Sequence, residues 1–96
     1  MKKHIDITIC GKVQGVTFRF SARIIAERMG IVGYAKNQDD GTVFIEAEGE
    51  EGDLGKFIDW CRRGPEEARV EKVDVIYSTA LKGYDKFESV RGLKTP

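Results

Sequence analysis

A strand, a glycine-containing loop and a helix follow one another in the first 29 residues, and this unit most constrains the fold. Isoleucines alternate with mostly polar residues over 4–10, which predicts a strand with one buried face. Apolar residues then recur at helical spacing, at Phe18, Ala22, Ile25, Ala26 and Met29. The loop between them, Gly11–Arg19, contains glycines, which accept backbone angles that other residues resist. At a helix N-terminus such a loop can turn several backbone N–H groups toward one small anion.

The remaining elements complete the order strand, helix, strand, strand, helix, strand, with a short final strand. Strands are predicted at 4–10, about 32–37, about 42–48, 70–77 and 86–90, and helices at 18–29 and from 50–53 to about Arg62. The turn Asp39-Asp40-Gly41 joins the second and third strands as a hairpin. This order is typical of the ferredoxin-like split βαβ sandwich, an α+β fold (βαββαβ) with two helices on one face of a mostly antiparallel sheet.

Length and charge limit the function classes. Ninety-six residues predict a single domain over 1–96. Sixteen basic residues balance sixteen acidic ones, so no overall field attracts nucleic acid or a membrane surface. The sequence has no apolar run typical of a signal peptide or a membrane span. We therefore expect a monomer in the cytoplasm, with no nucleic-acid or membrane partner.

Cysteine and histidine spacing predicts neither a metal site nor a disulfide. Cys61 falls on the apolar side of the second helix, and Cys10 has the opposite parity from the isoleucines, so the sheet should separate the two thiols. His4 has no neighbouring ligand in the sequence and is expected to be solvated. At the ends of the first helix, Thr17 is predicted to be an N-cap through its hydroxyl, and Gly30 a C-cap.

The loop itself predicts a phosphate site. Arg19 stands at the start of the helix, where its planar guanidinium can bind two oxygens of a phosphate. The Gly-Lys-Ser/Thr ending of a nucleotide-binding P-loop is missing, which makes nucleotide binding a poor interpretation. On glycine spacing alone, an ordinary connecting loop with a solvated arginine is the alternative.

The whole string Gly-x-Val-Gln-Gly-Val-x-Phe-Arg over 11–19 resembles the signature of the acylphosphatases, small enzymes that hydrolyse acyl phosphates to a carboxylate and inorganic phosphate. A second stretch, Gly33–Val43, looks like that family's second motif, an aromatic after Gly, then Asn, then Asp-Gly-x-Val. Gly64-Pro65 followed by 68–73 looks like the family's passage from the second helix into the fourth strand. The resemblance thus runs from the first strand to the fourth.

The resemblance implies the site residues. Arg19 and the backbone amides of the loop should bind the transferring phosphoryl group, principally the amides of Gln14, Gly15, Val16, Thr17 and Phe18. Asn37 should position the attacking water. The partners expected are a small acyl phosphate as substrate and inorganic phosphate as product, with no cofactor and no metal. Family members often carry Gly or an aromatic residue where Thr17 stands, and an uncharged residue in place of Asp39.

Three alternatives remain beside this hypothesis. A non-catalytic module of the same fold could sense phosphate or another ligand, although the presence of both Arg19 and Asn37 favours turnover. RNA-recognition motifs share the topology, but their third strand carries a basic residue and several aromatic residues on the open sheet face. The predicted third strand here has one aromatic and two acidic residues, which makes RNA binding a poor interpretation. The acylphosphatase-like domain of hydrogenase-maturation carbamoyltransferases belongs to longer chains with Cys-rich zinc motifs, and we expect a stand-alone enzyme. Phe20 and Tyr34 could border the acyl side of a substrate.

Overall fold

The alternating isoleucines of β1 (Lys2–Lys12) decide which face of the sheet is buried. In the computed structural model, which describes residues 1–90, Ile5, Ile7 and Ile9 are fully buried beneath the two helices. Each sheet neighbour contributes its own apolar residues to the same face, because side chains along a strand point alternately to the two sides. The predicted period of two therefore determines the core.

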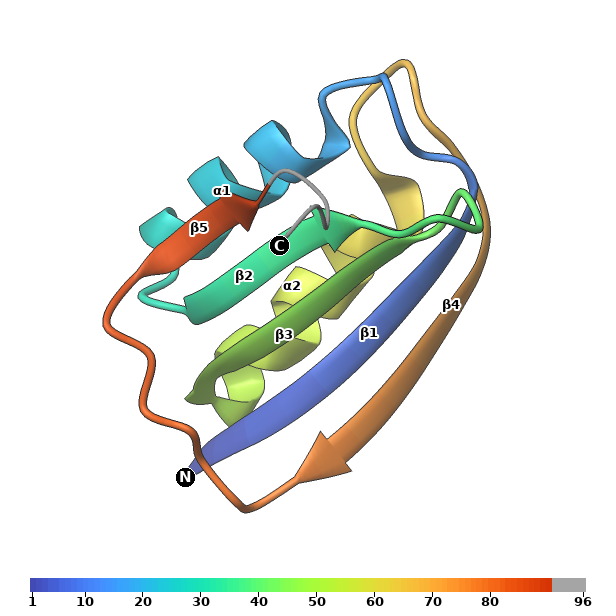
Figure 1. Cartoon of the computed structure of the whole chain (residues 1–96). Coiled ribbons are helices and arrows are strands. Elements are labelled where there is room, and N and C mark those ends of the chain that lie inside the picture. Colours follow the sequence, from blue (N-terminus) through green and yellow to red (C-terminus); the bar gives the residue numbers. More distant parts are fainter. Residues whose placement is uncertain (91–96) are drawn as a thin grey trace.

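The sheet has five strands in the order β4-β1-β3-β2-β5 (Figure 1). After β1, the chain forms α1 (Phe18–Arg28), β2 (Val32–Asn37), β3 (Val43–Glu50), α2 (Glu51–Arg63), β4 (Arg69–Ser78) and β5 (Phe87–Val90). Neighbouring strands are antiparallel except β2 and β5, which are parallel. The predicted βαββαβ order, its short final strand and the α+β class are confirmed.

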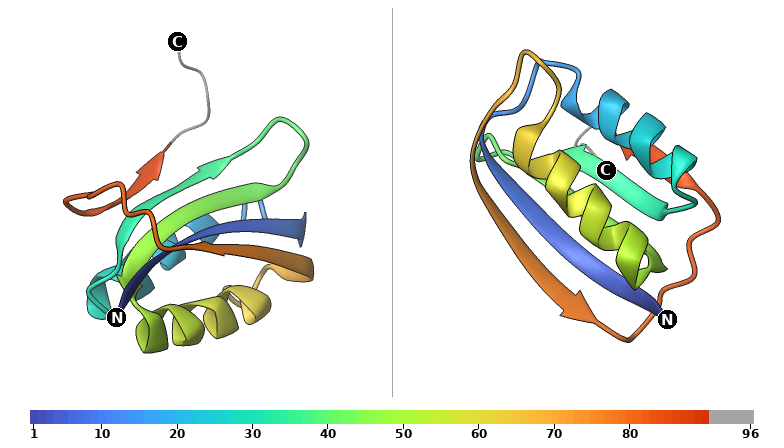
Figure 2. Two further views of the ribbon diagram at one scale, coloured as in Figure 1. Left: turned by 90° about the horizontal axis from the view of Figure 1, so that it is seen from below. Right: turned by 180° about the vertical axis from the view of Figure 1, so that it is seen from behind.

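The two helices cover one face, and the chain between β4 and β5 crosses the other (Figure 2). We call that second side of the sheet the open face. The central residue of α1's apolar side, Ala22, is fully buried, and α2 contributes Leu54, Phe57 and Cys61 to the same core. Cys61 is thus a core residue as predicted, and Cys10 is a partly buried free thiol on β1. No helix within residues 1–90 is long and apolar enough to cross a membrane.

The C-terminus of α1 carries the predicted glycine stop. The Gly30 N–H donates to the Glu27 carbonyl at 3.2 Å, and the Ile31 N–H donates to the Ala26 carbonyl at 2.9 Å. These two bonds form a Schellman motif, which satisfies carbonyls that the end of a helix leaves unpaired. Gly30 therefore follows the last helical turn and directs the chain into β2.

A β-bulge marks the place where β1 ends and the loop begins. Cys10 pairs with Lys72 but Gly11 pairs with Val70, so β4 has one extra residue between them. The bulge lets both Val70 and Val73 pack against the core in spite of their spacing of three. Gly11 has φ +128°, and a Cβ there would lie 2.1 Å from the Arg69 carbonyl oxygen. Only glycine fits this start of the loop.

Candidate active site

The loop between β1 and α1 presents backbone N–H groups that no other part of the described chain uses. Within residues 1–90, the amides of Gln14 to Phe18 donate no backbone hydrogen bond, and the first bond of α1 runs from the Ser21 N–H to the Thr17 carbonyl at 2.9 Å. Gly15 and Thr17 have φ of +74° and +60° on either side of Val16. Alternation of this kind turns successive N–H groups toward one side and forms an anion-binding concavity at the helix N-terminus.

Thr17 occupies the N-cap position, but the predicted cap is wrong. Its backbone lies in the left-handed region, and its hydroxyl donates to the Val16 carbonyl instead of accepting an N–H from the first turn of α1. A capping side chain requires an extended backbone at that residue, which the loop does not allow here. Thr17 is the one non-glycine residue with positive φ among residues 1–90. A β-branched residue in this region is strained.

We expect Thr17→Gly to raise the free energy of unfolding by about 0.5–1 kcal/mol. The left-handed conformation costs an L-residue roughly 1–2 kcal/mol, and the flexibility that glycine adds to the unfolded chain offsets roughly half of the relief. Thr17 makes no cap bond that the change would remove. Urea unfolding of the wild type, Thr17→Gly and Thr17→Ala would measure the effect. Alanine should bring no gain, and a loss of stability with glycine would contradict the strain.

Arg19 lies in the first turn of α1, beside the loop amides. Its guanidinium donates from Nη1 to the carbonyl of Val90, the last residue of β5. Val90 pairs with Lys36 in the parallel β2–β5 ladder, and Asn37 is the next residue of β2. The fold thus brings the cation of Arg19 to the end of β2 that carries Asn37. Sequence reasoning did not anticipate the contact with Val90, because a main-chain carbonyl leaves no residue-specific signal.

Asn37 is the last residue of β2, and β2 ends on the same side of the sheet as β1, where the loop begins. Its side-chain oxygen, Oδ1, is buried and has no hydrogen-bond partner among residues 1–90. A buried polar atom without a hydrogen bond lowers stability by about 1–3 kcal/mol, so such atoms are rare in folded proteins and often have a functional role. Asn37 lines a small recess with Lys36, Gln38 and Asp39. The arrangement is suited to an Asn that holds a water molecule or substrate.

The side chain of Gln14 connects the loop to the β2–β3 turn that follows Asn37. Sequence reasoning did not predict this contact. The Gln14 Nε2 donates to the carbonyls of Gln38 at 2.8 Å and Thr42 at 2.9 Å, on the two sides of the β2–β3 turn. The same turn is closed by the Gln38 N–H, which donates to the Thr42 carbonyl at 2.9 Å. The only sequence feature that indicated such a contact is that Gln14, a polar residue, stands between Val13 and Gly15 in the loop. Its partners are carbonyls 24 and 28 residues away, which no local pattern reveals.

The hairpin residues behave largely as the sequence indicates. Asp40 accepts from both the backbone N–H and the hydroxyl of Thr42, at 3.0 and 2.7 Å, so its carboxylate stabilises its own turn. These bonds hold the pKa of Asp40 below its usual range.

The two aromatic residues considered for the acyl side of a substrate lie on different elements. Phe20 is 55% exposed on α1. Tyr34 points to the open face, where its hydroxyl donates to Glu46 at 2.9 Å.

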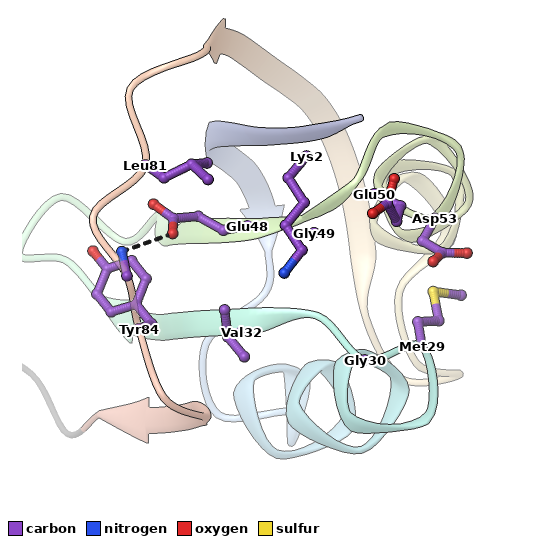
Figure 3. Close-up of a pocket in the computed structure, with 11 residues that line it drawn as sticks. Lys2, Met29, Gly30, Val32, Glu48, Gly49, Glu50, Asp53, Leu81 and Tyr84 are labelled. Atoms are coloured by element: carbon purple, nitrogen blue, oxygen red, sulfur yellow. Dashed lines mark hydrogen bonds between the residues drawn. The ribbon is translucent and has the colours of Figure 1, made fainter.

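A cavity of about 280 Å³ lies at the far end of the sheet from the loop (Figure 3). Its lining includes Lys2 at the start of β1 and Gly30 at the C-terminus of α1, whereas the loop follows the end of β1 and precedes α1. Acidic and apolar side chains mix there, and the Glu48 carboxylate accepts from the Gly83 N–H at 3.0 Å. The cavity therefore has no part in the phosphate site.

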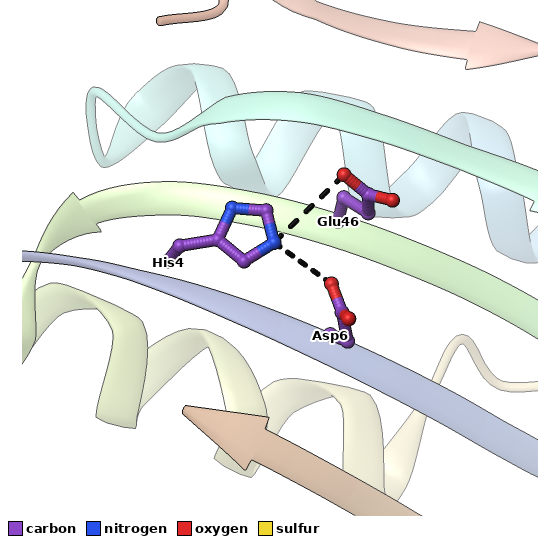
Figure 4. A group of neighbouring side chains, drawn as sticks. All are labelled: His4, Asp6 and Glu46. Carbon is purple, nitrogen blue, oxygen red and sulfur yellow. Dashed lines mark hydrogen bonds and ion pairs between the residues drawn. The ribbon is translucent and has the colours of Figure 1, made fainter. Parts of the chain in front are cut away.

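A charged cluster on the open face corrects the prediction for His4. Instead of being solvated, His4 is 5% exposed, with Nδ1 2.6 Å from Glu48. Its Nε2 lies 2.8 Å from Asp6 (Figure 4). Its Nε2 is also 3.8 Å from Glu46. The carboxylates come from the neighbouring strand and from position i+2, and the β4–β5 connection covers them through Lys82. Strand pairing made this cluster, so a search for neighbours along the sequence could not find it.

His4 should make stability depend on pH. Burial lowers its pKa, but hydrogen bonds and charges from Glu48 and Asp6 outweigh burial and raise the pKa above the ordinary 6.5. The stabilisation is therefore complete below pH 6.5 and lost as pH rises through the folded-state pKa. We expect the free energy of unfolding to fall above pH 6.5 in the wild type and to change less in His4→Gln. Urea unfolding between pH 6 and 9 measures both slopes.

A similar slope in His4→Gln would show that other groups cause the pH dependence.

At acidic pH, Glu48 changes the stability in the opposite direction, because its pKa lies below its ordinary 4.5. Its desolvation is outweighed by donors that include the Lys82 backbone N–H and the His4 ring. That contribution is present above pH 4.5 and is lost as pH falls. The optimum for the pair therefore lies between about pH 4.5 and 6.5.

The sequence is similar to those of known acylphosphatases. The family model described as acylphosphatase matches residues 5–89. An acylphosphatase from a Nocardioides species is 45% identical over 75 residues, which cover 78% of this chain and 76% of that protein. The range matched by the family model includes the loop, Arg19, Asn37 and the residues that Gln14 contacts.

Solved structures give the same result at the level of the fold. The crystal structure of acylphosphatase from Bacillus subtilis superposes with a TM-score of 0.90 at 35% identity, covering 92% of this chain and 98% of that one. An acylphosphatase structure from Coxiella burnetii has a TM-score of 0.88 at 34% identity, covering 93% of both chains. The similarity thus extends over nearly the whole of each of these proteins.

Proposed function

This chain belongs to the acylphosphatase family, and we propose that it hydrolyses the carboxyl–phosphate bond of small acyl phosphates with Arg19 and Asn37 as catalytic residues. The products are a carboxylate and inorganic phosphate. The observation that carries the assignment of residues is the run of unpaired amides from Gln14 to Phe18, next to Arg19. These donors have no described partner in the fold, and a phosphoryl group supplies acceptor oxygens for them.

The loop and Arg19 bind and stabilise the phosphoryl group. In phosphoryl transfer, charge spreads over three equatorial oxygens, and catalysis consists mainly of positioning and charge stabilisation. The backbone amides of Gln14, Gly15, Val16, Thr17 and Phe18 donate to these oxygens, and the Arg19 guanidinium offsets their charge. Its contact with the Val90 carbonyl orients the guanidinium before the substrate binds.

Asn37 orients the attacking water. Its buried, unpaired Oδ1 accepts a hydrogen bond from the water, which orients an oxygen lone pair toward phosphorus, in line with the departing carboxylate. The bond between water oxygen and phosphorus forms as the phosphorus–carboxyl oxygen bond breaks. The proton that the attacking water loses passes to a phosphate oxygen, so the products are the carboxylate and dihydrogen phosphate. A carboxylate is a good leaving group, so the reaction needs no strong general acid.

We propose that the reaction needs no metal and no cofactor. Within residues 1–90, one group of three His or carboxylate side chains has ligand atoms within 4.8 Å of one another: His4, Asp6 and Glu46. It lies on the open face, and Asp6 is five residues before Gly11, or roughly 16 Å along β1 at ~3.3 Å per residue. Arg19 supplies the positive charge at the phosphate site instead.

We propose that residues 1–96 form one domain that acts as a monomer in the cytoplasm; residues 91–96 lie outside the described part. The balance of sixteen basic and sixteen acidic residues supports a small-molecule partner over a nucleic acid or a membrane. Size-exclusion chromatography with light scattering measures the oligomeric state directly.

Hydrolysis of benzoyl phosphate by the purified protein in EDTA tests the function. We expect turnover, followed by ultraviolet absorbance, that is unaffected by the chelator. Phenyl phosphate is the matched control, because its leaving group is poorer and the site offers no assigned general acid, so its hydrolysis should be far slower. A folded wild type without turnover would contradict the enzyme and leave a phosphate-sensing module. Turnover that EDTA abolishes would contradict the metal-free mechanism.

A further inference from the structure

The two halves of the proposed site come from different parts of the chain. The phosphate-binding amides lie in the loop before α1, and Asn37 lies at the end of β2, next to the β2–β3 turn. An in-line attack requires the water to be held at a defined distance from the phosphorus. A misplacement of 1 Å can lower a rate about 10²-fold. Something must therefore fix the loop relative to the turn.

The Gln14 side chain makes this connection with both of its N–H groups. It donates to the carbonyl of Gln38, the residue after Asn37, and to the carbonyl of Thr42 across the turn. Two donors on one planar amide fix both the distance and the orientation of the turn, which a single bond would not do. A glutamate in its place would present oxygens to two carbonyls and could not donate.

The turn does not need Gln14 in order to form. It is closed by the Gln38 N–H to the Thr42 carbonyl at 2.9 Å and by the Gly41 N–H to the Gln38 carbonyl at 3.1 Å. Asp40 and the Gln38 side chain add bonds to Thr42 from within the turn. The Gln14 bonds are therefore the contacts that dock a preformed turn against the loop.

We infer that Gln14 is a positioning residue whose side chain sets the place of Asn37 relative to the phosphoryl group. The inference rests on the proposed function, and it concerns the side chain, whereas phosphate binding uses the Gln14 backbone amide. Replacing the side chain leaves that amide, the other loop amides and Arg19 in place. The water should then be misplaced while phosphate binding is largely kept.

Gln14→Met and Gln14→Glu test this inference, because both keep the length of the side chain and remove its donors. We expect kcat for benzoyl phosphate to fall about 10- to 100-fold in each. The inhibition constant of inorganic phosphate should change less than about threefold in Gln14→Met. Thermal unfolding of each variant shows whether the fold is retained.

A double-mutant cycle separates positioning from a merely structural role. If Gln14 acts through Asn37, Gln14→Met should lower kcat much less in an Asn37→Ala background than in the wild type. An equal loss in both backgrounds would overturn the inference, as would unchanged kcat in Gln14→Met. A parallel loss of phosphate binding would also overturn it, because the side chain would then only shape the loop.

The same experiments distinguish the inference from the proposed function. Wild-type turnover with an unaffected Gln14→Met variant contradicts only the role of Gln14. A wild type without turnover contradicts the proposed function itself, before any variant is compared.

Discussion

Replacing Arg19 with alanine is expected to lower kcat/KM for benzoyl phosphate by about 10³-fold or more. The change removes the cation beside the loop amides, and arginines that stabilise phosphoryl-transfer charge elsewhere contribute about 10³–10⁵ in kcat. Binding of inorganic phosphate should weaken as well, because the guanidinium is proposed to contact the phosphoryl group before and during the reaction. Steady-state kinetics and competitive inhibition by phosphate measure the two effects.

Arg23→Ala is the matched control for this variant. Arg23 lies one turn further along α1, 44% exposed, and pairs with Glu27 at 3.3 Å. An exposed i,i+4 ion pair contributes only about 0.3–0.5 kcal/mol to stability, so the fold should survive its loss. Because Arg23 has no proposed contact with the phosphoryl group, turnover should stay nearly unchanged. Arg19→Lys keeps the charge but not the planar guanidinium, and should recover part of the activity. Full activity in Arg19→Ala would contradict the assigned role.

Asn37→Ala is expected to lower kcat by about 10²–10³-fold, the size of effect seen when one well-aimed catalytic group is removed. Its signature differs from that of Arg19, because Asn37 is proposed to hold water and not phosphate. The inhibition constant of inorganic phosphate should therefore change little. Circular dichroism should show an unchanged fold, since Oδ1 has no partner to lose among residues 1–90.

The neighbouring Asp39→Asn provides the control for position. Asp39 is exposed at the turn, and its removal should change kcat little while lowering KM modestly at low salt, because one negative charge near an anionic substrate is lost. The KM difference should shrink as salt is added. Unchanged kcat in Asn37→Ala, or an equal loss in Asp39→Asn, would contradict the water-positioning role.

Local patterns predicted most of the fold. The period-two isoleucines of β1 define the buried face, Gly30 ends α1 with a Schellman motif, and the Asp-Asp-Gly turn forms the β2–β3 hairpin. Each of these depends on the backbone preferences of residues close in sequence, or on the alternation of side chains along one strand. Such information is present in the chain before it folds.

Predictions failed where partners were distant or where the backbone departed from its usual conformation. Thr17 has the right residue type and position for an N-cap, but the positive φ of the loop turns its hydroxyl away from the helix. His4 looked solvated because its partner Glu48 is 44 residues away, on the strand that pairs with β1. In both cases tertiary structure overrode a local preference.

The candidate site divides in the same way. The sequence by itself determined the fold class and the loop of Gly11–Arg19, because periodicity and glycine spacing are properties of the chain. Its resemblance to the acylphosphatases also predicted Arg19 and Asn37, the two residues proposed here as catalytic. Only the tertiary structure decided that Gln14 joins the loop to the β2–β3 turn and that Arg19 contacts the end of β5. Those contacts end on backbone carbonyls, which every residue possesses, so pairing in three dimensions alone selects which carbonyl is used.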